Sequence, residues 1–190
     1  MTTKELYDFA EGVKAKLEGL YKSRMIYKEL PIILYKKPSE LRNVKEIKDE
    51  EEDSLYLLAK DNLGLSVRDK WLIDFVQKYE LPYGRNTIFV FDKKDASDNQ
   101  LLSILTHELV HYFFTGIDSS SDVGQGYNEA CTDYLAEIVF GENYFSSYHE
   151  LLKDEPRQGY MKTYAEFYQA EEQAKRLVLE LYMAIPKNKN

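Results

Sequence analysis

The sequence predicts an α+β fold, with a small sheet built from the first half of the chain and helices in the second half. Short apolar runs typical of strands end at residue 91, and apolar residues then recur at helical spacing. Strands followed by a series of helices indicate the α+β class. The 190 residues are 44% hydrophobic and 31% charged, which is typical of a globular domain with a core of useful size.

A helix and two strands are expected in the first third of the chain. Residues 4–22 are predicted to be helical because their apolar side chains recur every three or four positions. Residues 30–35 (LPIILY) and 55–59 (LYLLA) are short apolar runs and are predicted to be strands. The acidic segment 45–54 lacks the alternation and the glycine of a calcium-binding loop, so we interpret it as a solvated loop.

The middle of the chain is expected to add a helix and the clearest strand. The helix runs from about Val67 to Tyr79, and Ser66 can cap its start. Residues 87–91 (TIFVF) combine β-branched and aromatic side chains in a short run, which is typical of a strand.

Capping signals mark the next helix. Ser97 and Gln100 form a capping box, and the helix that they begin is expected to run to about Phe114. Gly116 is expected to end it, because glycine adopts the left-handed conformation found after helices.

The remainder is expected to be a loop and two helices. Residues 116–126 are rich in Gly, Ser and Asp and are predicted to form a loop. Helices are predicted at residues 128–140 and at about 163–185, and the second of these is amphipathic. We expect a single domain, residues 1–190, with an N-terminal lobe of about 1–115 and a C-terminal lobe of about 116–190.

Charge and composition exclude some partners. The net charge of −8 argues against nucleic acid and against an anionic membrane, since neither would attract an acidic protein. The apolar runs are far shorter than the roughly 18 residues that span a bilayer. The start, MTTKELYDFAEG, has no signal-peptide core, and the single cysteine, Cys131, forms no intramolecular disulfide. We therefore expect a cytoplasmic protein.

The segment LTHELVHYF, residues 105–113, holds two of the three histidines. Four helical residues advance by about 400°, so His107 and His111 point the same way, about 6 Å apart along the axis. Two imidazoles so placed can bind one zinc ion, and Glu108 beside them can take a proton from a bound water. The plainer alternative is a buried helix that merely contains histidine, which requires a coincidence on the order of a few in a thousand.

A zinc site with an open position needs a third protein ligand. Glu129 in GYNEACTDYLAE, residues 126–137, begins the next predicted helix, and Asp133 shares its face. We interpret Glu129 as the third ligand and Asp133 as the acceptor of a hydrogen bond from His107, which would fix the imidazole. The alternative is that both carboxylates are solvated residues near the positive end of a helix.

HELVH and NEACTD (residues 128–133) together resemble the two motifs of the gluzincin clan of zinc metallopeptidases, which includes thermolysin. Thr132 stands where the clan has serine. The resemblance covers about residues 87–140, and the chain length is closest to small single-domain gluzincins. It implies a zincin-like fold, with a small, mostly antiparallel sheet, backing and active-site helices, and a helical C-terminal part.

The resemblance also implies an activity, the hydrolysis of peptide or protein substrates. His107, His111 and Glu129 would ligate Zn²⁺, and Glu108 would activate the zinc-bound water. The strand TIFVF would be a sheet edge that pairs with the substrate backbone.

The sequence offers several residues that could stabilise the oxyanion. His149 is the candidate, and four tyrosines compete with it: Tyr127, Tyr144, Tyr148 and Tyr160. The plainer alternative for His149 is a residue of a surface loop. A different function class is a catalytically silent zincin-like protein that binds metal or a partner. The intact Glu108 argues against this class, because a structural site needs no base.

Overall fold

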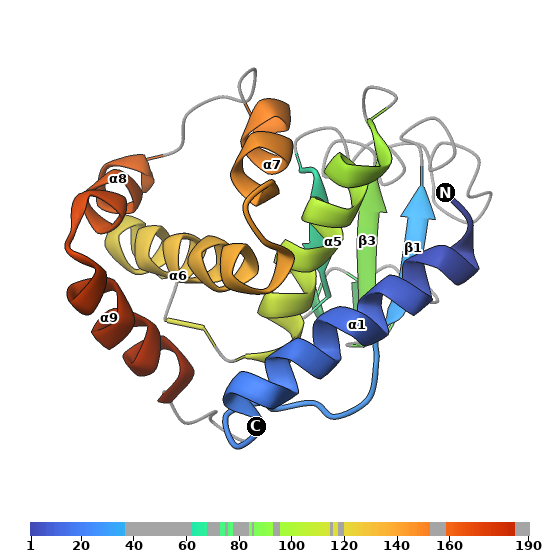
Figure 1. Ribbon diagram of the computed structural model, residues 1–190, viewed down its shortest axis with the longest axis horizontal. Helices are drawn as coiled ribbons and strands as arrows, with labels where there is room; N and C mark the ends of the chain where they lie inside the picture. The colour runs from blue at the N-terminus through green and yellow to red at the C-terminus, as the bar shows by residue number, and fades with distance from the viewer. Residues whose placement is uncertain are drawn as a thin grey trace.

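A three-stranded mixed sheet lies beside a set of helices that come mostly from the second half of the chain (Figure 1). Strand β3 (Thr87–Phe91) is in the middle. It pairs in parallel with β1 (Ile32–Lys36) and antiparallel with β2 (Gly64–Ser66). The predicted α+β class is confirmed. Among the described strands the sheet is mixed instead of mostly antiparallel, because β1 pairs with β3 in parallel. The computed structural model describes residues 1–36, 62–67, 73–74, 76–77, 84, 86–92, 96–114, 116–117, 120–152 and 159–184.

Strand β3 is buried along its whole length, and this changes one expectation. The prediction that TIFVF is a sheet edge is wrong, because β3 has a neighbour on each side. All five of its residues are buried. A strand covered on both faces has a continuous apolar run instead of alternation, and TIFVF is such a run. Within the described residues, β2 is the outer strand on one side of β3 and β1 on the other.

Four predictions between β1 and β3 have different outcomes. The solvated loop at 45–54 and the strand at 55–59 lie outside the described residues. Ser66 is the last residue of β2, and in the described part of the chain its buried hydroxyl has no hydrogen-bond partner, so the prediction that it caps a helix is not confirmed. Residues 73–74 and 76–77 are helical, in agreement with the helix predicted there.

Helices α1 (Thr3–Tyr21) and α5 (Asp98–Phe113) confirm the predictions for residues 4–22 and 97–114. Ser97 and Gln100 form the predicted capping box of α5. After α5 the chain turns at Gly116, which has a φ of +78°. The HELVH segment is thus part of α5, which packs against the sheet and α1.

Helix α6 (Asp122–Phe140) begins earlier than predicted, inside the expected loop 116–126. The hydroxyl of Ser121 caps it by accepting a hydrogen bond from the Gly124 N–H at 3.1 Å. Gly126 lies in the helix because another segment approaches closely. A Cβ atom there would lie 2.6 Å from Thr163 Cβ and 2.8 Å from the Tyr160 carbonyl oxygen. The glycine thus serves helix packing and does not mark a loop.

After α6, the described residues form three helices instead of the single predicted one. Helix α7 (Tyr144–Leu152) was not predicted. The helix predicted at about 163–185 is divided into α8 (Met161–Gln169) and α9 (Glu172–Ala184), because Ala170 is extended, with a ψ of 156°. The break allows α8 and α9 each to pack against α6 at its own angle (Figure 1). No glycine or proline marks it in the sequence.

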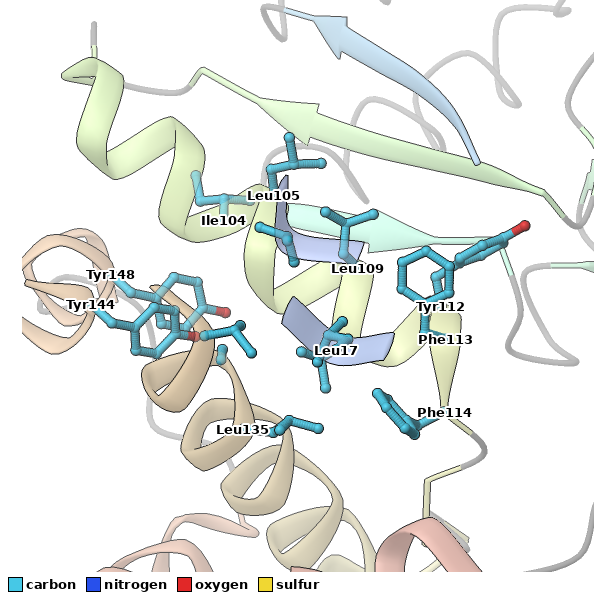
Figure 2. Packing of buried hydrophobic residues seen from close by; sticks show 14 of the residues in the cluster. Leu17, Ile104, Leu105, Leu109, Tyr112, Phe113, Phe114, Leu135, Tyr144 and Tyr148 are labelled. Atoms are coloured by element: carbon cyan, nitrogen blue, oxygen red, sulfur yellow. The ribbon is translucent and has the colours of Figure 1, made fainter. Parts of the chain in front are cut away.

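The core joins the helices to the sheet. Leu17 of α1, Leu105 and Leu109 of α5, and Leu135 of α6 belong to one cluster of buried side chains (Figure 2). Lys16 of α1 donates a hydrogen bond to the Val139 carbonyl oxygen near the end of α6 at 2.7 Å. A positive charge at this position stabilises the negative end of the α6 dipole. None of the described helices has the length and apolar character needed to cross a membrane.

Candidate metal centre

Two histidines of α5 face the same point in the interior. His107 and His111 are one helical turn apart, and their Nε2 atoms lie 3.1 Å from each other. His107 is 4% exposed and His111 is partly buried. The apolar residues of the preceding turns, which include Leu101, Ile104 and Leu105, are buried in the core and hold this stretch of α5 in place.

Helix α6 brings a carboxylate to both histidines. Glu129 Oε2 lies 3.3 Å from His107 Nε2, and Glu129 Oε1 lies 3.6 Å from His111 Nε2. Ligands at about 2.0–2.1 Å from a tetrahedral zinc ion are separated from each other by about 3.3–3.4 Å. The observed separations fit that value, so His107, His111 and Glu129 form a group that could hold a metal ion.

The charges in this group favour a cation. Burial raises the pKa of Glu129, but the charge of His111 and hydrogen bonds with both histidines lower it to about 2, so Glu129 is an anion at neutral pH. Burial lowers the pKa of His107, but Asp133 and Glu129 together raise it well above its ordinary value. The two carboxylates therefore stabilise positive charge between them, whether a proton or a metal ion supplies it.

Asp133 lies one turn after Glu129 and contacts the far side of the His107 ring. Its Oδ1 atom is 2.8 Å from His107 Nδ1, and the carboxylate is 2% exposed. The hydroxyl of Tyr144 also donates to Oδ1, and that of Tyr164 donates to Oδ2 at 2.6 Å. Burial raises the pKa of Asp133, but the charge of His107 and its hydrogen bonds hold it well below the usual range.

The second histidine has a different outer partner. His111 Nδ1 lies 3.4 Å from the hydroxyl oxygen of Thr132, which is 3.0 Å from the hydroxyl oxygen of Tyr182 on α9. Thr132 and Tyr182 are both fully buried. The threonine of NEACTD thus connects His111 to the last helix, and neither contact could be foreseen from the sequence.

The asparagine of NEACTD has a structural task. Asn128 Oδ1 accepts a hydrogen bond from the Ile117 N–H at 3.2 Å. A Cβ atom on Gly116 would lie 2.3 Å from the same oxygen. The side chain therefore ties the turn after α5 to the first part of α6, which helps to hold the two helices next to each other.

Glu108 lies next to His107 on α5 and is not part of the group formed by His107, His111 and Glu129. It is 6% exposed and faces β2. A Cβ atom on Gly64 would lie 2.6 Å from Glu108 Cγ and 2.8 Å from its Oε1 atom. Only a glycine leaves room for the Glu108 side chain against this strand, and no pattern in the sequence connects the two residues.

His149 lies on α7 and not in a surface loop. Its Nε2 atom is 3.0 Å from the hydroxyl oxygen of Tyr164 and 3.6 Å from Asp133 Oδ2. His149 is thus close to Asp133, the residue that contacts His107 Nδ1. Its role in stabilising an oxyanion stays a prediction. Among the competing tyrosines, Tyr148 stacks directly on the His107 ring, with centroids 4.9 Å apart.

Cys131 faces the core, as its position on the helix indicates. It is fully buried, and burial raises the pKa of its thiol to about 12. We expect a thiol-reactive disulfide reagent at pH 8 to label the folded protein at least about 100-fold more slowly than the protein in urea, because a buried thiol is neither ionised nor accessible. Rapid labelling of the folded protein would contradict this packing.

A functional assignment rests on the HELVH and NEACTD motifs and on the arrangement of their side chains. Compared with models of protein families, with curated proteins and with solved structures, the chain has no significant match.

Proposed function

We propose that this protein is a zinc-dependent metallopeptidase. The observation that carries the proposal is the convergence of two imidazole nitrogens and one carboxylate, 3.1–3.6 Å apart, next to a buried glutamate that is not part of the group. Two histidines and a glutamate suit zinc and leave a fourth position for water. Zinc at this site would act as a Lewis acid and lower the pKa of a bound water.

Glu108 is proposed to move the proton. A carboxylate beside the ligands can accept a proton from the attacking water and later give it to the leaving amine. Its burial and its contact with Gly64 restrict the side chain to one side of α5. Asp133 is proposed to hold His107 in the tautomer that leaves Nε2 free to bind the metal, since Nδ1 then carries the proton.

The substrate backbone is proposed to add to β2 instead of β3. Strand β3 is central, whereas β2 is the outer strand next to Glu108 in the described part of the chain. An extended peptide can pair with an outer strand through main-chain hydrogen bonds. Because Gly64 of β2 packs against Glu108, a peptide paired with β2 would lie close to the proposed base.

Tyr148 is proposed to stabilise the oxyanion in preference to His149. Its ring contacts a proposed ligand, whereas His149 Nε2 contacts Tyr164. Burial and the charges of Asp133 and Glu108 raise the pKa of Tyr148 well above its ordinary value. Its hydroxyl therefore stays protonated at neutral pH and can donate a hydrogen bond.

Zinc content tests the metal part of the proposal. We expect about one zinc ion per chain after dialysis against metal-free buffer, measured by elemental mass spectrometry. Glu129→Gln is expected to lose most of this zinc, because an amide is a much poorer ligand than a carboxylate. Glu137→Gln on the same helix is the matched control and should keep it, since Glu137 is not part of the group.

Two results would contradict the zinc assignment. The first is a wild-type protein that takes up no zinc on titration, and the second is equal zinc in the Glu129→Gln and Glu137→Gln variants. A protein that binds zinc but cleaves no member of a broad peptide library would favour the catalytically silent alternative.

A further inference from the structure

The carboxylate of Asp133 is held by two tyrosines from two different helices. Tyr144 of α7 donates to Oδ1, the oxygen that also contacts His107. Tyr164 of α8 donates to Oδ2 at 2.6 Å. Asp133 thus has contacts at both oxygens, although it is almost completely buried. A buried carboxylate is costly unless such donors satisfy it.

Each tyrosine restricts a different movement of the carboxylate. A carboxylate attached to a single Cβ can rotate, and a donor at Oδ2 opposes that rotation. With Oδ2 held by Tyr164, Oδ1 remains directed at His107 Nδ1. The Tyr144 hydroxyl oxygen lies 3.3 Å from His107 Nδ1. It therefore restricts the movement of the imidazole and of the carboxylate oxygen that contacts it.

We propose that Tyr164 and Tyr144 are positioning residues of the metal centre, which act through Asp133 on the ligand His107. The inference rests on the proposed metal site but not on peptidase activity. Both hydroxyls donate hydrogen bonds to the carboxylate of Asp133, and this carboxylate contacts His107 Nδ1. Outer partners of a ligating histidine typically change metal affinity by about 10- to 100-fold.

His149 extends the same chain of hydrogen bonds. The single hydroxyl hydrogen of Tyr164 is donated to Asp133, so the Tyr164 oxygen is left to accept from His149 Nε2 at 3.0 Å. The tautomer of His149 that carries its hydrogen on Nε2 is assigned from this network. His149 therefore supports Tyr164.

The packing of α8 on α6 places Tyr164 at this distance. Gly126 of α6 is in close contact with Thr163, the neighbour of Tyr164, and with the Tyr160 carbonyl. The absence of a side chain at position 126 lets α8 approach α6 closely enough for the Tyr164 hydroxyl to reach Asp133.

The chain contains a matched control for removal of this hydroxyl. Tyr168 lies one turn after Tyr164 on α8, and its ring packs against the Tyr164 ring at 5.0 Å. Its hydroxyl is buried and makes no hydrogen bond with Asp133. Tyr164→Phe and Tyr168→Phe thus remove the same atom from the same helix, but only the first change removes a contact with Asp133.

Zinc affinity, measured by competition with a chromophoric chelator, tests the proposal. We expect Tyr164→Phe to weaken zinc binding by about 10-fold and Tyr168→Phe to leave it within about twofold of wild type. In an Asp133→Ala background, Tyr164→Phe should have no further effect, because its only route to the metal is gone. Circular dichroism checks that each variant is folded.

Three outcomes would overturn the proposal. They are equal affinities of the two phenylalanine variants, additive effects of Tyr164→Phe and Asp133→Ala, and a wild-type protein that binds no zinc. If Tyr164→Phe does not fold, Tyr144→Phe is measured in the otherwise wild-type protein, and an unchanged zinc affinity then overturns the proposal. The Asp133→Ala background is not used for Tyr144, because its hydroxyl also contacts His107 Nδ1 directly. Zinc binding without peptide cleavage would contradict the peptidase function and leave this inference intact.

Discussion

Replacement of Glu108 by glutamine is expected to abolish peptide hydrolysis and to leave the zinc content unchanged. Glutamine has nearly the same shape and preserves the contact with Gly64, but it cannot accept the proton of the attacking water. A general base typically contributes about 100- to 10,000-fold, so kcat should fall by a factor in this range. The measurement compares cleavage of a library-derived peptide and zinc per chain in the two proteins.

A second glutamate provides the control for this experiment. Glu166 on α8 is 61% exposed, so Glu166→Gln should change neither activity nor metal content. If Glu108→Gln cleaves the peptide as fast as wild type, the activity does not come from this site. Loss of zinc from Glu108→Gln would instead indicate that Glu108 is a ligand or supports one.

Gly64→Ala is expected to reduce activity by about 100-fold without removing zinc. The added methyl group would lie 2.6 Å from Glu108 Cγ and 2.9 Å from Ile104 Cγ2, which is closer than atoms can approach. Because Ile104 is fixed in the core, Glu108 or β2 must shift. A misplacement of about 1 Å at a catalytic group can cost about 100-fold in rate, and overpacking typically costs about 1–3 kcal/mol of stability.

Gly12→Ala on α1 is the matched control for this substitution. A Cβ atom there meets nothing within 4 Å, so alanine should leave activity unchanged. It should also stabilise the protein by about 0.5–1 kcal/mol, because alanine is the better helix former. The measured quantity is kcat/KM for both variants. If Gly64→Ala keeps the kcat/KM of wild type, β2 does not restrict the position of Glu108.

Much of the fold could be predicted because local signals agree with the tertiary structure. The capping box of Ser97 and Gln100 marks the start of α5, and the helical period of residues 4–22 predicts α1. The apolar runs at 30–35 and 87–91 correspond to β1 and β3. In α1 and β3 the apolar residues that favour the local structure also face the core.

The errors occur where distant contacts override local signals. Gly124 and Gly126 are typical of a loop, yet they belong to α6, because close packing against α8 requires a small residue at position 126. Strand β2 has only three residues and contains a glycine, so its pairing with β3 is its only distinguishing feature. No local pattern could reveal either contact.

The sequence by itself determined which residues could form a metal site. The spacing of His107 and His111 on a helix places both imidazoles on one face, since helix geometry is the same in every protein. The position of Glu129 and Asp133 on one face of the next predicted helix added these two carboxylates, and the resemblance of HELVH and NEACTD to gluzincin motifs agrees with this choice. In the structure these four side chains lie together, at distances that suit a metal ion and one outer partner.

Only the tertiary structure decided what surrounds these residues. The approach of α7 and α8 brings Tyr144 and Tyr164 to Asp133, and β2 brings Gly64 to Glu108. A chain with 16 tyrosines has no local feature that distinguishes these two. The physical reason is that helix geometry relates residues within one element, whereas contacts between elements depend on how whole helices and strands pack.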